Sequence, residues 1–331
     1  MKVFVTGATG GLGRNVCLKL VGLGWNCIAS GRDLEVGHWL KDHEVQFIAA
    51  NLADVDGMAR AMAGCDAVLH CAALSSPWGT REQFYRHNVM GTANVLRAAG
   101  DAGIRRIVFV STPSVYFDFT HRRNISEDAP LPVRSVNAYA SSKLAAEGLV
   151  MDAVRQGMDC VILRPRGIIG PWDKALAPRL AKLAKRGWIP LPGGGHALID
   201  VTCAANVADA LVSATLAGPH VSGSIYNISN GVPLTARDLI AKALAVMGLS
   251  AKCLTIPVTS ALWASRLLEI AARMTGGWEP PVTAYALGLL AFDQTLDTNR
   301  ARTELGWEPL QSLDEGLEIF GKWWKSNYDQ G

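Results

Sequence analysis

The stretch that decides the fold is Thr6–Arg14, which reads TGATGGLGR and directly follows the apolar run Lys2–Thr6. It leads into a helical pattern of apolar residues over Leu12–Leu23. Three glycines leave the backbone bare where a pyrophosphate approaches, at positions 7, 10 and 13. The helix N-terminus behind them offers amide donors and a positive dipole end. A glycine-rich turn can also simply join a strand to a helix, but this position after the first strand favours a dinucleotide-binding loop of G-x-x-G-x-x-G spacing.

Short apolar runs alternate with helical patterns through the first half of the chain. The runs are largely unalternating, as expected for parallel strands that are covered on both faces. The expected strands are Lys2–Thr6, Asn26–Ser30, Val45–Ala50, Ala67–Cys71, Arg106–Ser111 and Asp159–Arg164, with helices between them such as Leu12–Leu23 and Phe84–Ala102. This βαβ rhythm predicts an α/β protein with a Rossmann-type doubly wound parallel sheet.

The rhythm changes after Pro165. Residues 166–200 are rich in glycine and proline, a composition suited to a binding loop. A helix is then expected at Ala205–Leu216 and a seventh strand at Ser224–Ile228, and the remainder is mostly helical. We therefore expect a dinucleotide-binding domain formed by residues 1–165 plus 201–232. A smaller, mostly helical C-terminal substrate-binding lobe is expected from residues 166–200 plus 233–331.

The composition excludes several classes of protein. A hydrophobic fraction of 49% and a charged fraction of 18% are typical of a folded globular chain, and a net charge of +3 is too small to indicate a nucleic-acid partner. The seven cysteines form no C-x-x-C pair and are interpreted as buried thiols, so no metal site is expected. No apolar run is long enough for a membrane span, and no signal region precedes the first strand. A cytoplasmic location is therefore expected.

The end of the second expected strand bears on the choice of cofactor. About 20 residues beyond the glycines, NAD sites usually place an acid on the ribose hydroxyls, whereas NADP sites place an arginine near the 2′-phosphate. Here Gly31 takes the place of the acid and Arg32 follows it. A guanidinium can clasp a phosphate that a carboxylate would repel. The sequence thus favours NADP(H) over NAD, although Asp33 offers an acid two places later and Arg32 can also be an ordinary surface residue.

A tyrosine and a lysine at helical spacing are candidates for proton transfer. The segment NAYASSK, residues 137–143, opens a helix expected over Asn137–Arg155 and places Tyr139 and Lys143 on one face. A free phenol has a pKa near 10, and a nearby ammonium together with the charge of an oxidised nicotinamide should lower it. Any single helix can show such a pair by chance.

Hydroxyl groups at the end of the fifth expected strand strengthen this interpretation. The strand ends in VSTPSVY, residues 110–116, and ligands bind open α/β sheets at the carboxyl ends of their strands. Thr112 is placed to hydrogen-bond a substrate oxygen while Tyr139 exchanges its proton. A turn rich in serine and threonine is the simpler alternative, but three elements in the correct order are hard to explain by chance.

These motifs together resemble the extended short-chain dehydrogenase/reductase family. The likeness covers nearly the whole chain and includes the glycine loop, His70–Ala73, Asn88–Asn94, Ser111–Tyr116, Tyr139 with Lys143, and Leu163–Pro165. The resemblance implies that Thr112, Tyr139 and Lys143 are catalytic, with Ser111 as a less favoured neighbour of Thr112. It implies cofactor contacts by Gly7, Thr9, Gly10, Gly11, Leu12, Gly13, Arg32, Asn51, Leu52, Cys71, Ala72, Ala73, Asn88, Ser111, Tyr139, Lys143, Pro165, Gly167 and Ile168.

Two details qualify that resemblance. Asn51 stands where the family usually has an aspartate that contacts adenine, and it keeps a hydrogen-bonding group there. The backbone near Pro165–Ile168 is expected to face the nicotinamide carboxamide. Pairs of long helices such as 84–102 and 137–155 often meet across a two-fold axis in this family, so a homodimer is expected by analogy.

The later segments most resemble the 3β-hydroxysteroid dehydrogenase branch, through Gly167–Asp173 and Asp200–Ala208. Sugar-nucleotide epimerases usually carry a basic residue before the segment equivalent to Leu198–Val201, where this chain offers only His196. This difference favours a less charged substrate. We expect an enzyme that interconverts a secondary alcohol and a ketone on a small, largely apolar molecule, steroid-like or a β-hydroxy or β-keto acid.

An apolar series at helical spacing, Trp263, Leu267, Ile270 and Met274, allows two interpretations. It forms either a lid over an apolar substrate, with possible peripheral contact with a membrane, or a face that packs against the sheet, which is the simpler reading. His87, His121 and Trp172 are candidates for lining the pocket, although lone residues of these types are more often structural.

Two rival functions remain open at the level of the sequence. A sugar-nucleotide epimerase or dehydratase would hold NAD tightly and show no net redox change. A nucleotide-sensing protein would keep the fold without the chemistry, but such proteins often lose the tyrosine or the lysine, and this chain has both.

Overall fold

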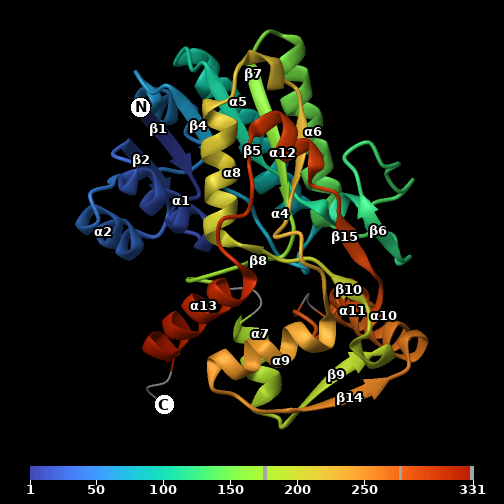
Figure 1. Cartoon of the computed structure of the whole chain (residues 1–331). Coiled ribbons are helices and arrows are strands. Elements are labelled where there is room, and N and C mark those ends of the chain that lie inside the picture. The colour runs from blue at the N-terminus through green and yellow to red at the C-terminus, as the bar shows by residue number, and fades with distance from the viewer. Residues whose placement is uncertain (174–176, 276–277, 329–331) are drawn as a thin grey trace.

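A seven-stranded sheet forms the centre of the protein (Figure 1). The computed structural model describes residues 1–173, 177–275 and 278–328. The strand order is β12-β7-β5-β4-β1-β2-β3, and every neighbouring pair is parallel. The strands are β1 (Lys2–Thr6), β2 (Asn26–Gly31), β3 (Gln46–Ala49), β4 (Ala67–His70), β5 (Arg106–Val110), β7 (Asp159–Pro165) and β12 (Ile225–Ile228). The predicted Rossmann-type doubly wound sheet is confirmed.

Helices cover both faces of this sheet, so both faces of each central strand are apolar. Along β1, Val3 and Val5 belong to one buried cluster and Phe4 to the other. The first cluster includes α1 (Gly11–Gly22), α2 (Leu34–Asp42), α8 (Ala204–Leu216) and α12 (Asn299–Leu305). The second includes α3 (Val55–Met62), α5 (Gly91–Asp101) and α6 (Ala138–Arg155). Burial on both faces is the physical reason for the unalternating apolar runs in the sequence.

Beyond the carboxyl edge of the sheet lies a smaller, mostly helical part, as predicted (Figure 1). Its helices are α7 (Ala177–Ala184), α9 (Ala236–Met247), α10 (Val258–Met274), α11 (Ala284–Ala291) and α13 (Leu313–Tyr328). A third apolar cluster joins residues of α7, α9 and α13 to β9 (Trp188–Pro192), which pairs with β14 (Lys252–Ile256).

Several short strands in this part had no signal in the sequence. β8 (Ile168–Ile169) pairs with β11 (Thr202–Cys203), and a four-stranded sheet contains β13 (Leu234–Thr235), β10 (Leu198–Ile199), β15 (Gln294–Leu296) and β6 (Arg122–Ile125). Strands of two or three residues are too short to show alternation. Because β6 comes from the first half of the chain, this sheet links segments that are far apart in sequence.

The single helix predicted over 84–102 is wrong in its first part. The chain forms α4 (Arg81–Phe84), then a π-helical turn over Tyr85–Met90, and only then α5. A π-helical turn widens the helix locally and is often found at functional sites. Apolar periodicity cannot detect this change, because the buried Phe84, Val89 and Val95 satisfy either winding.

The simpler reading of the apolar series on α10 is also wrong. Trp263, Leu267, Ile270 and Met274 are 66%, 62%, 55% and 81% exposed, so they do not pack against the sheet. The buried residues of α10 are instead the small Ser265 and Ala272. The apolar face of α10 therefore points away from the core.

Candidate active site

The glycine loop leaves no room for side chains. A Cβ at Gly13 would lie 2.3 Å from the Gly7 carbonyl oxygen, and one at Gly7 would lie 2.6 Å from Ala72 Cα. Gly7 also has a φ of +69°, which favours glycine. Gly10 caps α1 without a side-chain hydrogen bond, so no side chain satisfies the first amides of that helix, which include those of Gly11 and Leu12. Bare amides at a helix N-terminus suit a pyrophosphate.

The end of β2 is closed to an acidic side chain. A Cβ at Gly31 would lie 2.4 Å from the Thr9 Cγ2 methyl, so no larger residue fits there. Asp33, the alternative acid, caps α2 and accepts a hydrogen bond of 3.1 Å from the Val36 amide. Arg32 is exposed, and its charge helps to lower the pKa of His87 on the π-helical turn, after the larger effect of burial.

A second arginine lies beside the glycine loop. The guanidinium carbon of Arg14 is 5.8 Å from the ring centre of Trp39 and 5.6 Å from that of Trp172. Its Nε is buried without a hydrogen-bond partner, and burial lowers its pKa against the opposing effect of Asp33. Trp172 has a φ of +64°, and its carbonyl oxygen lies 2.8 Å from the position of a Cβ at Gly11. The segment around Trp172 thus lies directly against the glycine loop.

The other predicted adenosine contacts lie in loops after β3 and β4. Asn51 is exposed and accepts a hydrogen bond of 3.1 Å from the Ala53 amide, while the Leu52 side chain packs near Gly91 on α5. After β4, the Ala72 amide donates to the Thr6 hydroxyl at 3.2 Å. Cys71 and Ala72 are half-buried and Ala73 is exposed. Burial raises the pKa of the Cys71 thiol to about 12, so it is not a nucleophile.

Asn88 lies in the π-helical turn, and its side chain bonds within the protein. Its Oδ1 accepts from the Leu74 amide at 2.7 Å, and its Nδ2 donates to the Ser142 hydroxyl at 2.9 Å and to the Leu74 carbonyl at 3.2 Å. Asn88 therefore joins the loop after β4 to α6, next to Lys143. Asn88 would therefore contribute to the predicted cofactor site indirectly, because it positions these two segments.

Lys143 is buried at the end of β5. It is 2% exposed, and its Nζ donates to the Val110 carbonyl at 2.6 Å and lies 4.1 Å from the Phe109 ring centre. Burial lowers the pKa of this ammonium to about 7, against the opposing charges of Glu147 and Cys71. No ion pair with Lys143 occurs among the residues that the structure describes.

Tyr139 begins the same helix, one turn before Lys143. Asn137 caps this helix by accepting from the Ala140 amide at 2.8 Å, which fixes where Tyr139 emerges. Burial raises the pKa of the phenol, and hydrogen bonds with Ser75 and Thr112 partly oppose this rise. The expected lowering by Lys143 is absent in the protein alone, because its ammonium is turned to the Val110 carbonyl. Tyr139 is therefore protonated at neutral pH and suited to donate a proton.

A chain of hydroxyl groups extends from Thr112 toward α11. The Thr112 hydroxyl is 2.9 Å from that of Ser114, which is 2.5 Å from the hydroxyl of Tyr285. Ser111 points elsewhere and donates to Glu147 Oε1 at 2.5 Å. Of the two neighbouring candidates, only Thr112 acts on the pKa of the Tyr139 phenol, which it lowers.

Behind α6, a buried network holds these segments in place. Arg164 on β7 donates to both oxygens of Glu147, at 2.8 and 2.5 Å, and to the Tyr116 hydroxyl at 2.5 Å. Burial lowers the pKa of Arg164, but the hydrogen bond and charge of Glu147, together with Tyr116, raise it by more in sum. Tyr116 donates in turn to Asn227 on β12 at 3.0 Å.

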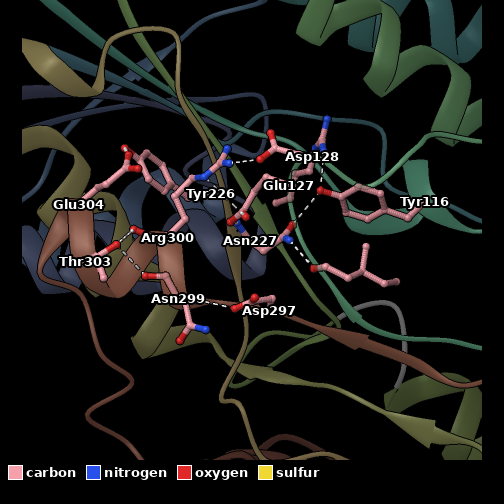
Figure 2. A network of polar contacts seen from close by, with 12 residues as sticks. Tyr116, Glu127, Asp128, Tyr226, Asn227, Asp297, Asn299, Arg300, Thr303 and Glu304 are labelled. Atoms are coloured by element: carbon pink, nitrogen blue, oxygen red, sulfur yellow. Dashed lines mark hydrogen bonds and ion pairs between the residues drawn. The ribbon is translucent and has the colours of Figure 1, made fainter.

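Figure 2 shows how this network continues outward. The Asn227 amide donates to Glu127 at 2.7 Å, and its side chain donates to the Ile125 carbonyl at 2.9 Å. Glu127 lies 3.9 Å from Arg300 on α12, which also pairs with Asp128. The network thus anchors the segment that connects Thr112 to α6 against β12 and α12 (Figure 2).

The predicted nicotinamide end lies where β7 leaves the sheet. Pro165 pairs with Ile228 in β12, and Gly167 turns the chain with a φ of +42°. The Gly167 carbonyl accepts from the Thr202 amide at 3.1 Å, and Ile168 then starts β8. Two of the remaining pocket candidates lie apart from this end: His121 is exposed beside Asp293, and Trp172 covers the glycine loop.

Three residues of this region had no signal in the sequence. Ser75 lies in a loop, and Tyr285 lies among apolar residues on α11. Arg166 follows a recognisable motif, but nothing in the sequence distinguishes it from the structural Arg164. Only the fold brings Ser75 and Tyr285 to Tyr139.

Other types of site are not formed by the described residues. They contain no group of three or more His, Cys, Asp or Glu side chains that could hold a metal ion. None of their helices combines the length and the apolar character that crossing a bilayer requires.

The arrangement combines a bare phosphate cradle with a proton donor. The cradle fits a dinucleotide, because Gly7 and Gly13 let the loop fold tightly against neighbouring backbone before α1 and because Arg14 keeps an unsatisfied buried Nε beside it. The phenol of Tyr139, the ammonium of Lys143 and the hydroxyl of Thr112 come together where β5 ends and α6 begins. Such a site can transfer a proton to or from an oxygen held next to a bound nicotinamide.

Comparisons with known proteins agree with this geometry. The model of the NAD dependent epimerase/dehydratase family matches residues 3–229. A 2-alkyl-3-oxoalkanoate reductase of Stenotrophomonas maltophilia is 35% identical over 96% of this chain and 97% of its own length. A 4-hydroxy-2-methyl-3-oxo-4-farnesyl-3,4-dihydroquinoline-1-oxide ketoreductase of Stigmatella aurantiaca is 34% identical over 96% of this chain and 95% of its own.

The predicted likeness to 3β-hydroxysteroid dehydrogenases is also confirmed. A 3beta-hydroxysteroid-dehydrogenase/decarboxylase of Arabidopsis thaliana, isoform 2, is 32% identical over 84% of this chain and 52% of its own length.

Proposed function

The chain belongs to the NAD dependent epimerase/dehydratase family, and on this premise we propose that it is an NADP(H)-dependent oxidoreductase that interconverts a secondary alcohol and a ketone on a largely apolar substrate. It is an NAD(P)-dependent enzyme of the extended short-chain type. The preference for NADP(H), the reaction and the roles of the residues are the proposal. In it, residues 1–165 plus 201–232 bind the dinucleotide, and 166–200 plus 233–331 bind the substrate.

The observation that carries the proposal is the convergence of Tyr139, Thr112 and Lys143 at one edge of the sheet. In the direction of reduction, the Tyr139 hydroxyl donates its proton to the carbonyl oxygen as that carbon becomes the secondary alcohol. Thr112 holds the same oxygen, and Lys143 supports the phenolate that is left and binds the ribose hydroxyls. A bound nicotinamide dinucleotide supplies or accepts the hydride.

Two arginines support NADP(H). Gly31 has no carboxylate to offer a ribose, and one oxygen of the Asp33 carboxylate is used as a helix cap. Arg32 follows directly after β2, and the guanidinium of Arg14 lies within reach of the charge of Asp33. Both cations are suited to a 2′-phosphate at the end of β2.

Aromatic residues support an apolar substrate. Phe117, Phe119, Phe292 and Tyr285 pack together, with ring centres 5.0 to 6.3 Å apart, beside the hydroxyl of Ser114. The relatives reported above, two reductases and one dehydrogenase/decarboxylase, act on alkyl, farnesyl or steroid compounds according to their names. The remaining candidate is a sugar-nucleotide epimerase or dehydratase, as the name of the family allows.

The test replaces Tyr139 by phenylalanine. Tyr139→Phe removes the proton donor without changing the ring, so we expect turnover of apolar ketones with NADPH to fall by about 10²–10⁴-fold while NADPH affinity stays unchanged. Tyr85→Phe removes a hydroxyl from an exposed tyrosine and serves as the control. Near-normal turnover by Tyr139→Phe would remove this residue from its role.

The cofactor of the purified protein separates the two reactions. If the protein is denatured and the released nucleotide is identified, an exchangeable NADP(H) supports the reductase. Firmly retained NAD, together with no net oxidation of added NADPH by any ketone, would support the epimerase instead.

Two less central expectations belong to the same proposal. A cytoplasmic location is supported by the free thiol form of all seven cysteines, since disulfides form in oxidising compartments. A homodimer paired through α5 and α6 rests on analogy with the family, and the mass in solution by light scattering tests it.

A further inference from the structure

Arg166 is buried at the end of β7 without a partner for its charge. Only 6% of the residue is exposed, yet its guanidinium forms no hydrogen bond or ion pair with any described residue. Some described polar side-chain atoms are fully enclosed without a hydrogen bond, but the guanidinium nitrogens of Arg166 are not among them. These nitrogens therefore reach a space that solvent can enter. A desolvated cation is costly unless something compensates it.

The position of Arg166 places it on the substrate side of the catalytic groups. β5 and β7 are neighbours in parallel register, with Val110 beside Leu163, so Thr112 and Arg166 emerge from adjacent strand ends. The charge of Arg166 acts on the Tyr285 hydroxyl, which in turn is close enough to affect Tyr139. Tyr285 therefore acts electrostatically on both Arg166 and Tyr139.

The one carboxylate near Arg166 is used elsewhere. Asp200 Oδ2 accepts from the Leu296 amide at 2.7 Å and from the Ser229 hydroxyl at 3.2 Å. Asp200 is too far from Arg166 for an ion pair but still attracts its charge, and Asp200 Oδ1 has no hydrogen-bond partner. Asp200 thus lowers the cost of burying Arg166 without occupying its donors.

We propose that Arg166 binds a carboxylate of the substrate, so that the apolar ketone reduced at Tyr139 is an oxo acid. This inference rests on the proposed function and adds the anionic group to it. A guanidinium presents paired donors that match a carboxylate, and the unpaired charge of Arg166, which acts on Tyr285, suits one negative charge rather than a diphosphate.

A binding experiment tests Arg166 without relying on turnover. Decanoate and decan-1-ol are matched alkyl probes, titrated by calorimetry into the NADPH-loaded enzyme. The natural enzyme should bind decanoate about 10- to 100-fold more tightly than decan-1-ol, the range of a hydrogen-bonded charge, and Arg166→Gln should lose this preference. Arg166→Lys keeps the charge and should retain part of it, and Arg186→Gln removes an exposed charge as the control.

A turnover experiment separates this proposal from the proposed function. NADPH oxidation is measured with a 2-alkyl-3-oxodecanoate and with its methyl ester. The natural enzyme should prefer the acid, and Arg166→Gln should lower kcat/KM for the acid by about 10- to 100-fold while leaving the ester unchanged. Equal use of acid and ester by both proteins overturns the role of Arg166 but keeps the reductase. Turnover of neither overturns the reductase, and the decanoate titration still decides Arg166.

Two further outcomes would overturn the proposal. If Arg166→Gln weakened NADPH binding as strongly as acid binding, Arg166 would serve the cofactor. If Arg166→Gln lowered the urea midpoint of unfolding and left the acid preference intact, Arg166 would be a counter-charge for Asp200. We expect the midpoint to stay the same or rise, because the variant removes an uncompensated buried charge.

Discussion

The interior of the sheet and its carboxyl edge hold cations differently. In the interior, Arg164 is held by both oxygens of Glu147, and Arg106 pairs with Asp159 at 2.7 Å. At the carboxyl edge, Lys143 donates to a backbone carbonyl, and the half-buried Arg14 lies beside two tryptophans. Arg166, only two residues after Arg164, has no partner among the described residues.

This difference indicates where a bound ligand supplies the negative charge that compensates a buried cation. A paired buried cation contributes to the stability of the fold, whereas an unpaired one reduces it and persists where a ligand supplies the compensation. The unpaired cations mark a path across the carboxyl edge of the sheet. Arg14 lies at the glycine loop, Lys143 one turn after the proposed proton donor Tyr139, and Arg166 at the proposed substrate carboxylate.

The largest effect should come from breaking a pair in the interior. Arg164→Met leaves the Glu147 carboxylate buried without its partner, so we expect the free energy of unfolding to fall by about 3–5 kcal/mol. Replacing both residues, Glu147→Leu with Arg164→Met, should restore much of that loss. Urea denaturation followed by circular dichroism measures both. A loss below about 1 kcal/mol for Arg164→Met would mean that this pair behaves like a surface ion pair.

The pH dependence of the enzyme should report the unpaired Lys143. Its folded pKa of about 7 lies below the usual value of 10.5, so between these two values the unfolded chain binds a proton that the folded chain lacks. The stability contribution of this group therefore rises with pH across that window. The charged form is the active one, so kcat/KM for NADPH should fall up to tenfold per unit above about pH 7.

One outcome would contradict this predicted pH profile. A flat kcat/KM from pH 6 to pH 9 would mean that Lys143 keeps its proton through another contact. The same measurement on Glu147→Gln, if the variant folds, should move the fall to lower pH, because Glu147 raises the pKa of Lys143.

The smallest effect is expected at the exposed Arg32. Arg32→Ser should lower the preference for NADPH over NADH by about tenfold, the size of one charge-assisted hydrogen bond at a solvated site. Arg97→Ser, on the exposed face of α5, is the matched control. Fluorescence titration with each nucleotide gives the ratio, and an unchanged ratio would assign the 2′-phosphate to Arg14 alone.

The cofactor side of the fold was predictable because its rules are local. Strands covered on both faces give continuous apolar runs, and a glycine loop needs glycine wherever another backbone comes close, as Gly13 shows against Gly7. Tyr139 and Lys143 follow a one-turn spacing that a single helix preserves. Pattern and structure therefore agree for the seven strands of the central sheet and for the first turn of α6.

The substrate side was less predictable because its contacts join distant segments. Tyr285 reaches Ser114 from 171 residues away, and no local pattern distinguishes it from a packing residue. The apolar face of α10 has a regular helical period and is nonetheless exposed. The π-helical turn at Asn88 and the unpaired state of Arg166 both depend on neighbours that only the folded chain provides.

The most direct measurement of the central claim follows a labelled hydride. NADPH carrying deuterium at C4 is mixed with a 2-alkyl-3-oxodecanoate and the enzyme, and the alcohol is analysed by mass spectrometry and NMR. The account predicts one deuterium at C3 of the product with the natural enzyme and almost none with Tyr139→Phe. Recovery of unreduced ketone, with the label still on the nucleotide and with NAD released only on denaturation, would contradict it.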